Sequence, residues 1–243
     1  MAETATIREL ERKLERLEPV PRPDAPAAVP TGMEPLDELL PRGGLPRGEG
    51  TEWLGPRSCG KTAVLRAALG RLRRSGEPAA VVDAARSLHA PDWEELAAGK
   101  GRFWVVRPPE PREAPWCADL LLRSGAFGAV ALLLGGEGDG GRGGADGVAL
   151  SRSTAVRLQR LAGEAGTVLL VSGELPVASL RLRFRPGRVE PVGGRLFGPF
   201  LPEVRPVWIR VGPGGRRAEV PVLCPPARPR GADARGRDRK GRR

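Results

Sequence analysis

Residues 55–62 carry the feature that most constrains the fold, the eight-residue segment GPRSCGKT. This segment fits the pattern GxxxxGK[ST], in which glycines let the backbone curl until its N–H groups face a phosphate. It lies between a predicted strand at 51–54 and a predicted helix at 61–75, which is the context that the pattern requires. The sequence therefore predicts a phosphate-binding loop made of the following residues: Gly55, Pro56, Arg57, Ser58, Cys59, Gly60, Lys61 and Thr62.

The residue types of this loop indicate ATP and Mg²⁺ as candidate ligands. Lys61 would reach the β and γ phosphates, and the hydroxyl of Thr62 would bind Mg²⁺. The N-terminus of the following helix would add its positive dipole end. Cys59 has two interpretations: a reactive thiol, because helix N-termini lower the thiol pKa, or a small residue that fills a variable position of the loop.

The rest of the central segment predicts an α/β fold with a mostly parallel sheet. Apolar runs at 79–83, 103–107, 129–134 and 167–171 read as strands, and the last two are wholly apolar, as strands covered on both faces must be. Helices are predicted at 35–40 and 151–162, and strands that alternate with helices imply right-handed parallel crossovers. The segments at 179–185, 206–211 and 218–223 predict antiparallel strands at the sheet edge.

We divide the chain into four parts: a helix at 1–18, a proline-rich extended spacer at 19–30, a globular domain at 31–224 and a disordered Arg-rich tail at 225–243. Apolar residues recur in the first part at helical spacing, namely Ile7, Leu10, Leu14 and Leu17. This face must dock on the chain's own domain or on a partner. We favour a partner, because a spacer follows the helix.

Positive charge gathers at the C-terminal end. The formal net charge is +11, and the tail contributes eight cations: Arg228, Arg230, Arg235, Arg237, Arg239, Lys240, Arg242 and Arg243. Such a segment attracts polyanions, DNA above all. DNA, an acidic protein surface and a plain solubilising role all remain open for it.

Composition excludes several classes of protein. No stretch approaches the roughly 20 apolar residues of a membrane span, and the N-terminus is charged rather than signal-like. The three cysteines form no CxxC motif, and there is one histidine, so neither disulfides nor a zinc site are indicated. We expect a cytoplasmic protein without membrane contact.

Several segments resemble the RecA superfamily in the right order. TGMEPLDELLPRGGLPRGEGTEWLGPRSCGKT (31–62) is similar to the start of the RecA core, and 81–88, 123–134 and 160–174 resemble its next segments. With SLRLRF (179–184), the chain resembles the ImuA family of bacterial damage-induced mutagenesis cassettes. The resemblance implies a RecA-like fold, a role in the SOS response and translesion synthesis, and three partners: RecA, a Y-family-polymerase-like adaptor (ImuB-type) and a DnaE-type polymerase.

The chain departs from RecA-type ATPases at the catalytic positions. The glutamate that polarises the attacking water is replaced by Ala85, and the strand that should end in a Mg²⁺-binding aspartate ends in Leu133-Leu134-Gly135. Without these carboxylates we expect no working ATPase and name no catalytic residue. Glu137, Asp139 or Asp83 remains open as a substitute for the aspartate.

The DNA-binding elements of RecA are reduced as well. The glutamine switch position is Gly173 or Glu174, and the mobile DNA loop after it is nearly absent. The first DNA loop corresponds to 135–147 and carries Arg142 as its one cation. Tyrosine is absent and aromatics are 4%, so stacking platforms for bases are scarce. Trp93, near the adenine position of RecA, either stacks on a base or packs in the core.

Three functions remain open from the sequence. The first is a RecA-like accessory protein in error-prone translesion synthesis. The second is an active or slow RecA/RadA-type DNA-dependent ATPase, which requires a substitute carboxylate. The third is a nucleotide-binding structural protein of the KaiC type, without a link to DNA.

Overall fold

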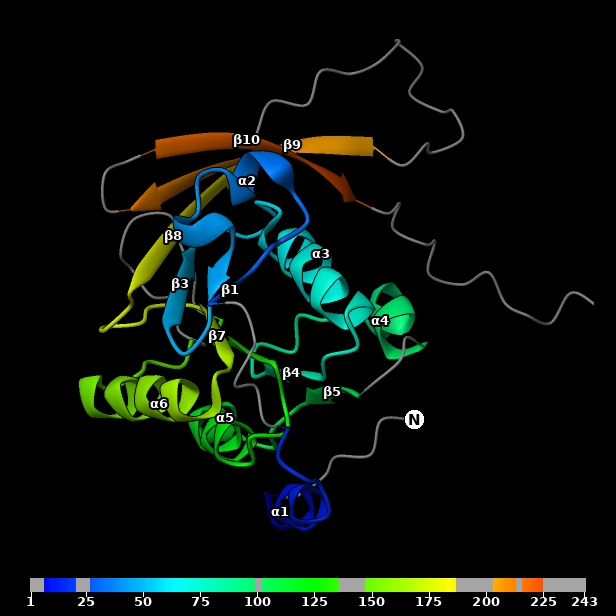
Figure 1. The fold of residues 1–243 in the computed structure, drawn as a ribbon, viewed down its shortest axis with the longest axis vertical. Coiled ribbons are helices and arrows are strands. Elements are labelled where there is room, and N and C mark those ends of the chain that lie inside the picture. The colour runs from blue at the N-terminus through cyan, green and yellow to red at the C-terminus, as the bar shows by residue number, and fades with distance from the viewer. Residues whose placement is uncertain are drawn as a thin grey trace, which may run out of the picture.

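The computed structural model describes residues 7–20, 27–98, 102–135, 147–186, 203–212 and 216–224. Their centre is one eight-stranded sheet with the strand order β10-β9-β8-β3-β7-β6-β4-β5. The strands are β3 (Gly50–Leu54), β4 (Ala79–Asp83), β5 (Phe103–Val106), β6 (Ala129–Leu133), β7 (Val168–Ser172), β8 (Leu180–Pro186), β9 (Glu203–Gly212) and β10 (Arg216–Cys224). Helices cover both faces of the sheet (Figure 1), which confirms the predicted α/β architecture.

Most strand pairs of this sheet are parallel. β3 pairs with both β7 and β8, β6 pairs with β4 and β7, and β4 pairs with β5, all in parallel. The antiparallel pairs are β8–β9 and β9–β10 at one edge. The prediction of antiparallel edge strands is therefore confirmed for β9 and β10. It is confirmed for β8 as well, which is antiparallel to β9, while the other neighbour of β8, β3, runs parallel to it.

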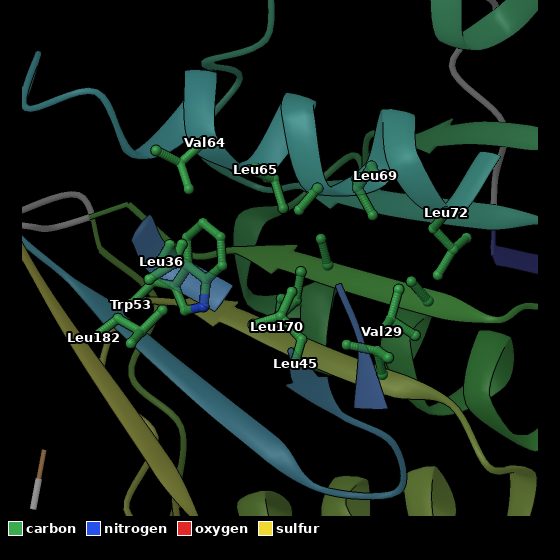
Figure 2. Packing of buried hydrophobic residues seen from close by; sticks show 14 of the residues in the cluster. Val29, Leu36, Leu45, Trp53, Val64, Leu65, Leu69, Leu72, Leu170 and Leu182 are labelled. Carbon is green, nitrogen blue, oxygen red and sulfur yellow. The ribbon is translucent and has the colours of Figure 1, made fainter. Parts of the chain in front are cut away.

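The central strands of the sheet contribute to two cores, one on each face. On β4, Ala79 and Val81 face one core, while Ala80 and Val82 face the other, because successive side chains of a strand point to opposite faces. The first core lies under α2 (Glu34–Asp37) and α3 (Lys61–Arg74), and Figure 2 shows Val64, Leu65 and Leu69 of α3 above the sheet. The second lies under α5 (Ala114–Arg123) and α6 (Arg152–Ala165).

Helix α5 was not predicted from the sequence. In the structure a capping box directly precedes it. Glu110 and Glu113 exchange side-chain and backbone hydrogen bonds across η3 (Pro111–Glu113), and α5 follows directly. Its buried residues recur at helical spacing, namely Ala114, Cys117, Ala118, Leu121 and Leu122. That spacing is visible in the sequence and indicates a helix. The remaining helical turns are η1 (Pro41–Gly43), η2 (Ala90–Trp93) and α4 (Glu94–Ala98).

The N-terminal part differs from the prediction in two respects. The helix α1 spans Ile7–Glu15 and packs on the chain's own domain near α5 (Figure 1), not away from it. The end of the predicted spacer forms β1 (Ala28–Val29), which pairs antiparallel with β2 (Leu45–Pro46). Ala28 and Val29 are buried, so this stretch belongs to the globular domain.

Some predictions fall outside the described residues. These include the tail at 225–243 and the glycine-rich segment at 136–146, with Glu137, Asp139 and Arg142. In the part of the chain that is described, no helix has the length and apolar character needed to cross a membrane.

Candidate phosphate-binding site

The predicted loop connects the end of β3 to the start of α3, as the motif requires. Ser58 and Gly60 have φ angles of 59° and 91°, so the loop turns through the left-handed region twice. A Cβ on Gly60 would collide with Val207 of β9, and one on Gly55 would lie 2.5 Å from the carbonyl oxygen of Phe184 on β8. Glycine is therefore required at both positions, because the loop rests directly on the neighbouring strands.

The Lys61 side chain lies inside the loop and binds the first residue of the loop. Its side chain is buried, and Nζ donates a hydrogen bond of 2.8 Å to the carbonyl oxygen of Gly55. Burial lowers the pKa of Lys61 to about 8, because the protonated ammonium loses hydration in the loop. The ammonium is thus protonated at neutral pH and poised to lose its proton in mildly alkaline solution.

Cys59 and Thr62 differ in their exposure to solvent: Cys59 is buried and Thr62 is exposed. Cys59 is 2% exposed and belongs to the core beneath the loop, and burial raises the pKa of its thiol. The interpretation as a reactive thiol is therefore wrong, and the filling role fits its position. Thr62, in the first turn of α3, is exposed and available to a ligand.

The Asp83 carboxylate, which lies beside Leu133, uses both of its oxygens in hydrogen bonds within the chain. Asp83 is completely buried at the end of β4, and its oxygens accept hydrogen bonds from the backbone N–H groups of Ser87 (2.9 Å) and Leu88 (3.1 Å). Arg107 donates its Nε–H to the same carboxylate at 3.2 Å. These contacts hold the turn after β4, so Asp83 serves that turn rather than a metal ion.

The two positions that lack carboxylates are adjacent in space. Leu133, at the end of β6, is in register with Asp83, and its carbonyl oxygen accepts the N–H groups of Ala84 and Ala85. Leu133 is buried and Ala85 is exposed. The structure therefore places an alkyl group and a methyl group side by side at the two positions where the resemblance to RecA-type ATPases leads us to expect acids.

The loop fits a nucleotide phosphate better than it fits a complete metal site. Its left-handed turns, the N-terminus of α3 and the Lys61 ammonium all favour an anion. For Mg²⁺, the described residues offer the Thr62 hydroxyl, and nowhere in those residues are three His, Cys, Asp or Glu side chains placed to hold a metal ion. ATP, when bound, would supply phosphate oxygens to its own Mg²⁺, and water would complete the octahedral shell beside the Thr62 hydroxyl.

The switch position of RecA is replaced by a short locked connection. After β7, the N–H of Gly173 donates to the carbonyl oxygen of Trp53 at 3.2 Å, while Glu174 is exposed. Glu52 of β3 is buried and accepts the N–H of Leu175 at 2.8 Å. Glu52 was not predicted to hold this connection, although a single acidic residue within a predicted strand is a signal that the sequence shows.

Trp93 belongs to the core. It is 4% exposed and stacks on Phe103, with ring centroids 5.8 Å apart and planes inclined by 6°. The packing interpretation is confirmed for this tryptophan. The same rings line an apolar cavity of about 710 Å³ between α1, α4 and β5, to which Leu10 and Lys13 of α1 also contribute.

The predicted partner-binding face of α1 is covered in this chain. Leu10 and Leu14 are 4% and 7% exposed within the second core, while Ile7 and Leu17 are partly buried against it. These side chains therefore stabilise the chain's own fold. The predicted cations of the tail lie outside the described residues.

Comparison with known proteins agrees with this geometry. Residues 22–133 match the RecA N-terminal domain family. The chain is 41% identical to Protein RecA of Salinispora tropica over 106 residues, which are 44% of this chain and 30% of that protein. It is 36% identical to Protein RecA of Treponema pallidum over 102 residues, 42% of this chain and 25% of that protein. The chain thus matches less than a third of the length of these relatives.

The fold extends further than the sequence match. A crystal structure of the RadB recombinase superposes with a TM-score of 0.53 at 19% identity, covering 79% of this chain and 94% of that one. This likeness concerns the fold alone. The loop between β3 and α3 and the strand order around it thus lie in a chain whose residues 22–133 resemble the RecA N-terminal domain and whose fold resembles that of RadB.

Proposed function

We propose that this protein is a RecA-like accessory factor in DNA damage tolerance, acting in SOS mutagenesis and translesion synthesis through protein contacts rather than through ATP turnover. The proposal combines the RecA-superfamily core with the resemblance of residues 31–211 to the ImuA family. RecA, an ImuB-type adaptor and a DnaE-type polymerase are the proposed partners.

One observation carries the proposal. The phosphate loop keeps Gly60 and Lys61 in the geometry of an anion site, while Ala85 and Leu133 occupy the catalytic positions. Removing acid–base help alone typically slows an enzymatic step by about 10²–10⁴-fold. A chain that loses both acids yet keeps the loop is suited to a structural use of the fold, in which nucleotide stabilises a surface for partners.

Asp83 strengthens this interpretation. A slow ATPase would need a substitute carboxylate, and Asp83 is the described candidate closest to Leu133. Its oxygens are already engaged by Arg107 and by the backbone of residues 87 and 88. Releasing it for Mg²⁺ would leave the buried turn and the Arg107 guanidinium without their acceptor, which is costly.

The test measures turnover and binding on the full chain. We expect ATP hydrolysis no faster than that of the Lys61→Ala variant, with or without single-stranded DNA and RecA. We also expect direct binding to RecA or to the ImuB-type adaptor, measured by biosensor with and without ATP. Turnover close to that of RecA, abolished by Lys61→Ala, would instead establish the DNA-dependent ATPase. Failure to bind either partner in both nucleotide states would contradict the accessory role.

A further inference from the structure

The outward face of β8 and β9 carries a group of cations that the proposed function does not use. On β8, apolar and basic residues alternate: Leu180, Leu182 and Phe184 are buried, and Arg181, Arg183 and Arg185 are exposed. On β9, Trp208 and Arg210 are exposed between buried neighbours, and the Trp208 side chain is 43% exposed. Trp208 is one of two exposed tryptophans in the described residues, the other being Trp116 of α5, and it is the one that lies on the same strand face as these arginines.

The strand register brings these residues together in pairs. Arg183 stands opposite Arg210, and Arg185 stands opposite Trp208. Directly opposed residues of an antiparallel pair have Cβ atoms roughly 4.5–5.5 Å apart, and like charges in such pairs are destabilising. The opposed arginines therefore repel each other in the free protein, and an anion bound between them would remove that repulsion.

These arginines are not neutralised within the described part of the chain. Arg181 forms an ion pair with Glu52 at 3.4 Å. In the same described residues, Arg183, Arg185 and Arg210 make no ion pair. Among the side chains that the structure describes, three guanidinium groups without an ion pair thus lie around one exposed indole.

The face is also hollowed at this point. A depression of about 260 Å³ lies between the two strands, lined by Arg183, Arg185, Pro186, Trp208, Ile209 and Arg210. The indole, the proline ring and the methylene stems of the arginines make its walls apolar, while the guanidinium groups make its rim cationic. Its chemistry is therefore apolar inside and positive around the opening.

We propose that this hollow binds an acidic peptide segment of a partner protein, which places one large apolar side chain beside Trp208 and carboxylates on Arg183, Arg185 and Arg210. Guanidinium groups bind carboxylates in bidentate fashion, which gives both strength and orientation. Tryptophan and arginine are also the residue types that most often dominate the energy of protein interfaces. The inference is separate from the accessory role and stands without it.

A peptide fits this site better than a nucleic acid does. Single-stranded nucleic acid is held by a basic groove that follows the backbone and by several rings on which successive bases stack. Here Trp208 is the one exposed ring of the described β8 and β9 residues. A single exposed ring offers no row of platforms for successive bases, whereas it suffices as the anchor of one apolar side chain of a peptide.

The test uses two synthetic peptides and the full chain. One peptide has the sequence Asp-Glu-Asp-Glu-Leu-Phe-Asp-Glu-Asp-Glu, and the other has alanine in place of Leu-Phe. We expect the first to bind at least about tenfold more tightly than the second and to shift the indole N–H resonance of Trp208, which the Trp208→Phe variant assigns. Trp208→Ala should weaken the first peptide about tenfold and leave the second unchanged, because only the first has an apolar anchor.

Charge variants separate the site from general attraction to a basic protein. Arg183→Gln with Arg210→Gln should weaken both peptides, whereas Arg152→Gln with Arg160→Gln, on the exposed face of α6, removes equal charge and should weaken neither. Equal loss in both variants overturns the proposal, as does absence of peptide binding at about millimolar concentration. The oligonucleotide dT20 tests the alternative ligand. If Trp208→Ala weakens the binding of dT20 as much as the binding of the first peptide, the proposal is overturned and the hollow is a site for single-stranded nucleic acid.

The opposed arginines give a further check on the free protein. Arg210→Gln should raise the melting temperature by about a degree or two at low salt, because it relieves the repulsion from Arg183. Added salt should reduce this difference by screening the charges. A melting temperature that falls instead would show that the pair is neutralised, and would contradict the premise of an unbalanced site.

Discussion

Arg107 donates its Nε–H to the carboxylate of Asp83 at 3.2 Å, which ties the end of β5 to the end of β4. The carboxylate is completely buried and the arginine side chain is 33% exposed. Arg107 also donates to the carbonyl oxygen of Leu88 at 2.5 Å. The turn in which the resemblance leads us to expect a catalytic glutamate is thus held by an ion pair, and an exposed alanine, Ala85, stands at that position.

This relationship predicts the effect of removing the arginine. Arg107→Met should lower the free energy of unfolding by about 1–3 kcal/mol, because it leaves a buried carboxylate short of a partner while keeping the apolar stem. The expected loss of unfolding free energy is smaller than for a fully buried ion pair, since the arginine side chain is partly exposed. Urea denaturation measures the change, and Arg112→Met, on an exposed arginine of η3, is the control. Equal stability of both variants would contradict a structural role for the pair.

The lowered pKa of Lys61 predicts how nucleotide affinity depends on pH. The pKa is lowered to about 8 by burial, so the ammonium is protonated at pH 7 and neutral at pH 9.5. A phosphate prefers the charged form, so affinity for ADP should fall as the pH rises above about 8. Titration calorimetry at several pH values measures the fall.

The matched variant for this prediction is Lys61→Arg. The guanidinium stays protonated throughout this range, so the affinity of the variant for ADP should be nearly flat between pH 7 and 9.5. Parallel pH profiles of the two proteins would show that another group controls the affinity.

The position of α1 predicts an effect on stability. Leu14→Ala should lower the free energy of unfolding by about 2–4 kcal/mol, because Leu14 is buried in the core shared with α5. Arg12→Ala, on the exposed side of the same helix, should change it little. Thermal unfolding of both variants provides the measurement. If Leu14→Ala is as stable as the parent, α1 does not rest on its own domain, and the original prediction of a partner regains its basis.

The tail gives a prediction that rests on sequence alone. Deleting residues 226–243 removes eight cations and should weaken binding to single-stranded DNA. Each phosphate contact contributes about 0.7 to the slope of log affinity against log salt, so the slope should flatten by up to about 6 if all eight cations make contacts. The loss should be the same for all base sequences, because phosphate contacts carry no sequence information. Unchanged DNA binding after truncation would leave the tail a solubilising role.

Much of the core follows from local patterns. The glycines and the lysine of residues 55–62 specify a phosphate loop wherever a strand precedes and a helix follows. The apolar runs at 129–134 and 167–171 specify strands covered on both faces, since each alternate side chain must find a core. These patterns predicted β3, β6, β7 and α3 to within one residue at each end. Ala85 and Leu133 were equally visible, because a missing acid is a property of the sequence.

Other features depend on contacts that no local pattern contains. The apolar face of α1 requires a neighbour, but its periodicity is the same whether that neighbour is α5 or another protein. The parallel pairing of β8 with β3 joins residues far apart in the sequence, and the connection from β7 to β8 contacts β3 as well, through the N–H of Leu175 and the Glu52 carboxylate. Asp83 could be counted as a candidate metal ligand until Arg107, 24 residues away, was seen to occupy it.

The sequence by itself therefore determined the phosphate loop, the helices around the sheet and the presence of Ala85 and Leu133 at the positions where the resemblance leads us to expect acids. Tertiary structure decided which buried polar groups pair, where α1 docks and which side chains share a face, as Arg183 and Arg210 do. The physical reason is range: turn geometry and side-chain periodicity act over a few residues, whereas burial, ion pairing and strand register join residues that only folding brings together.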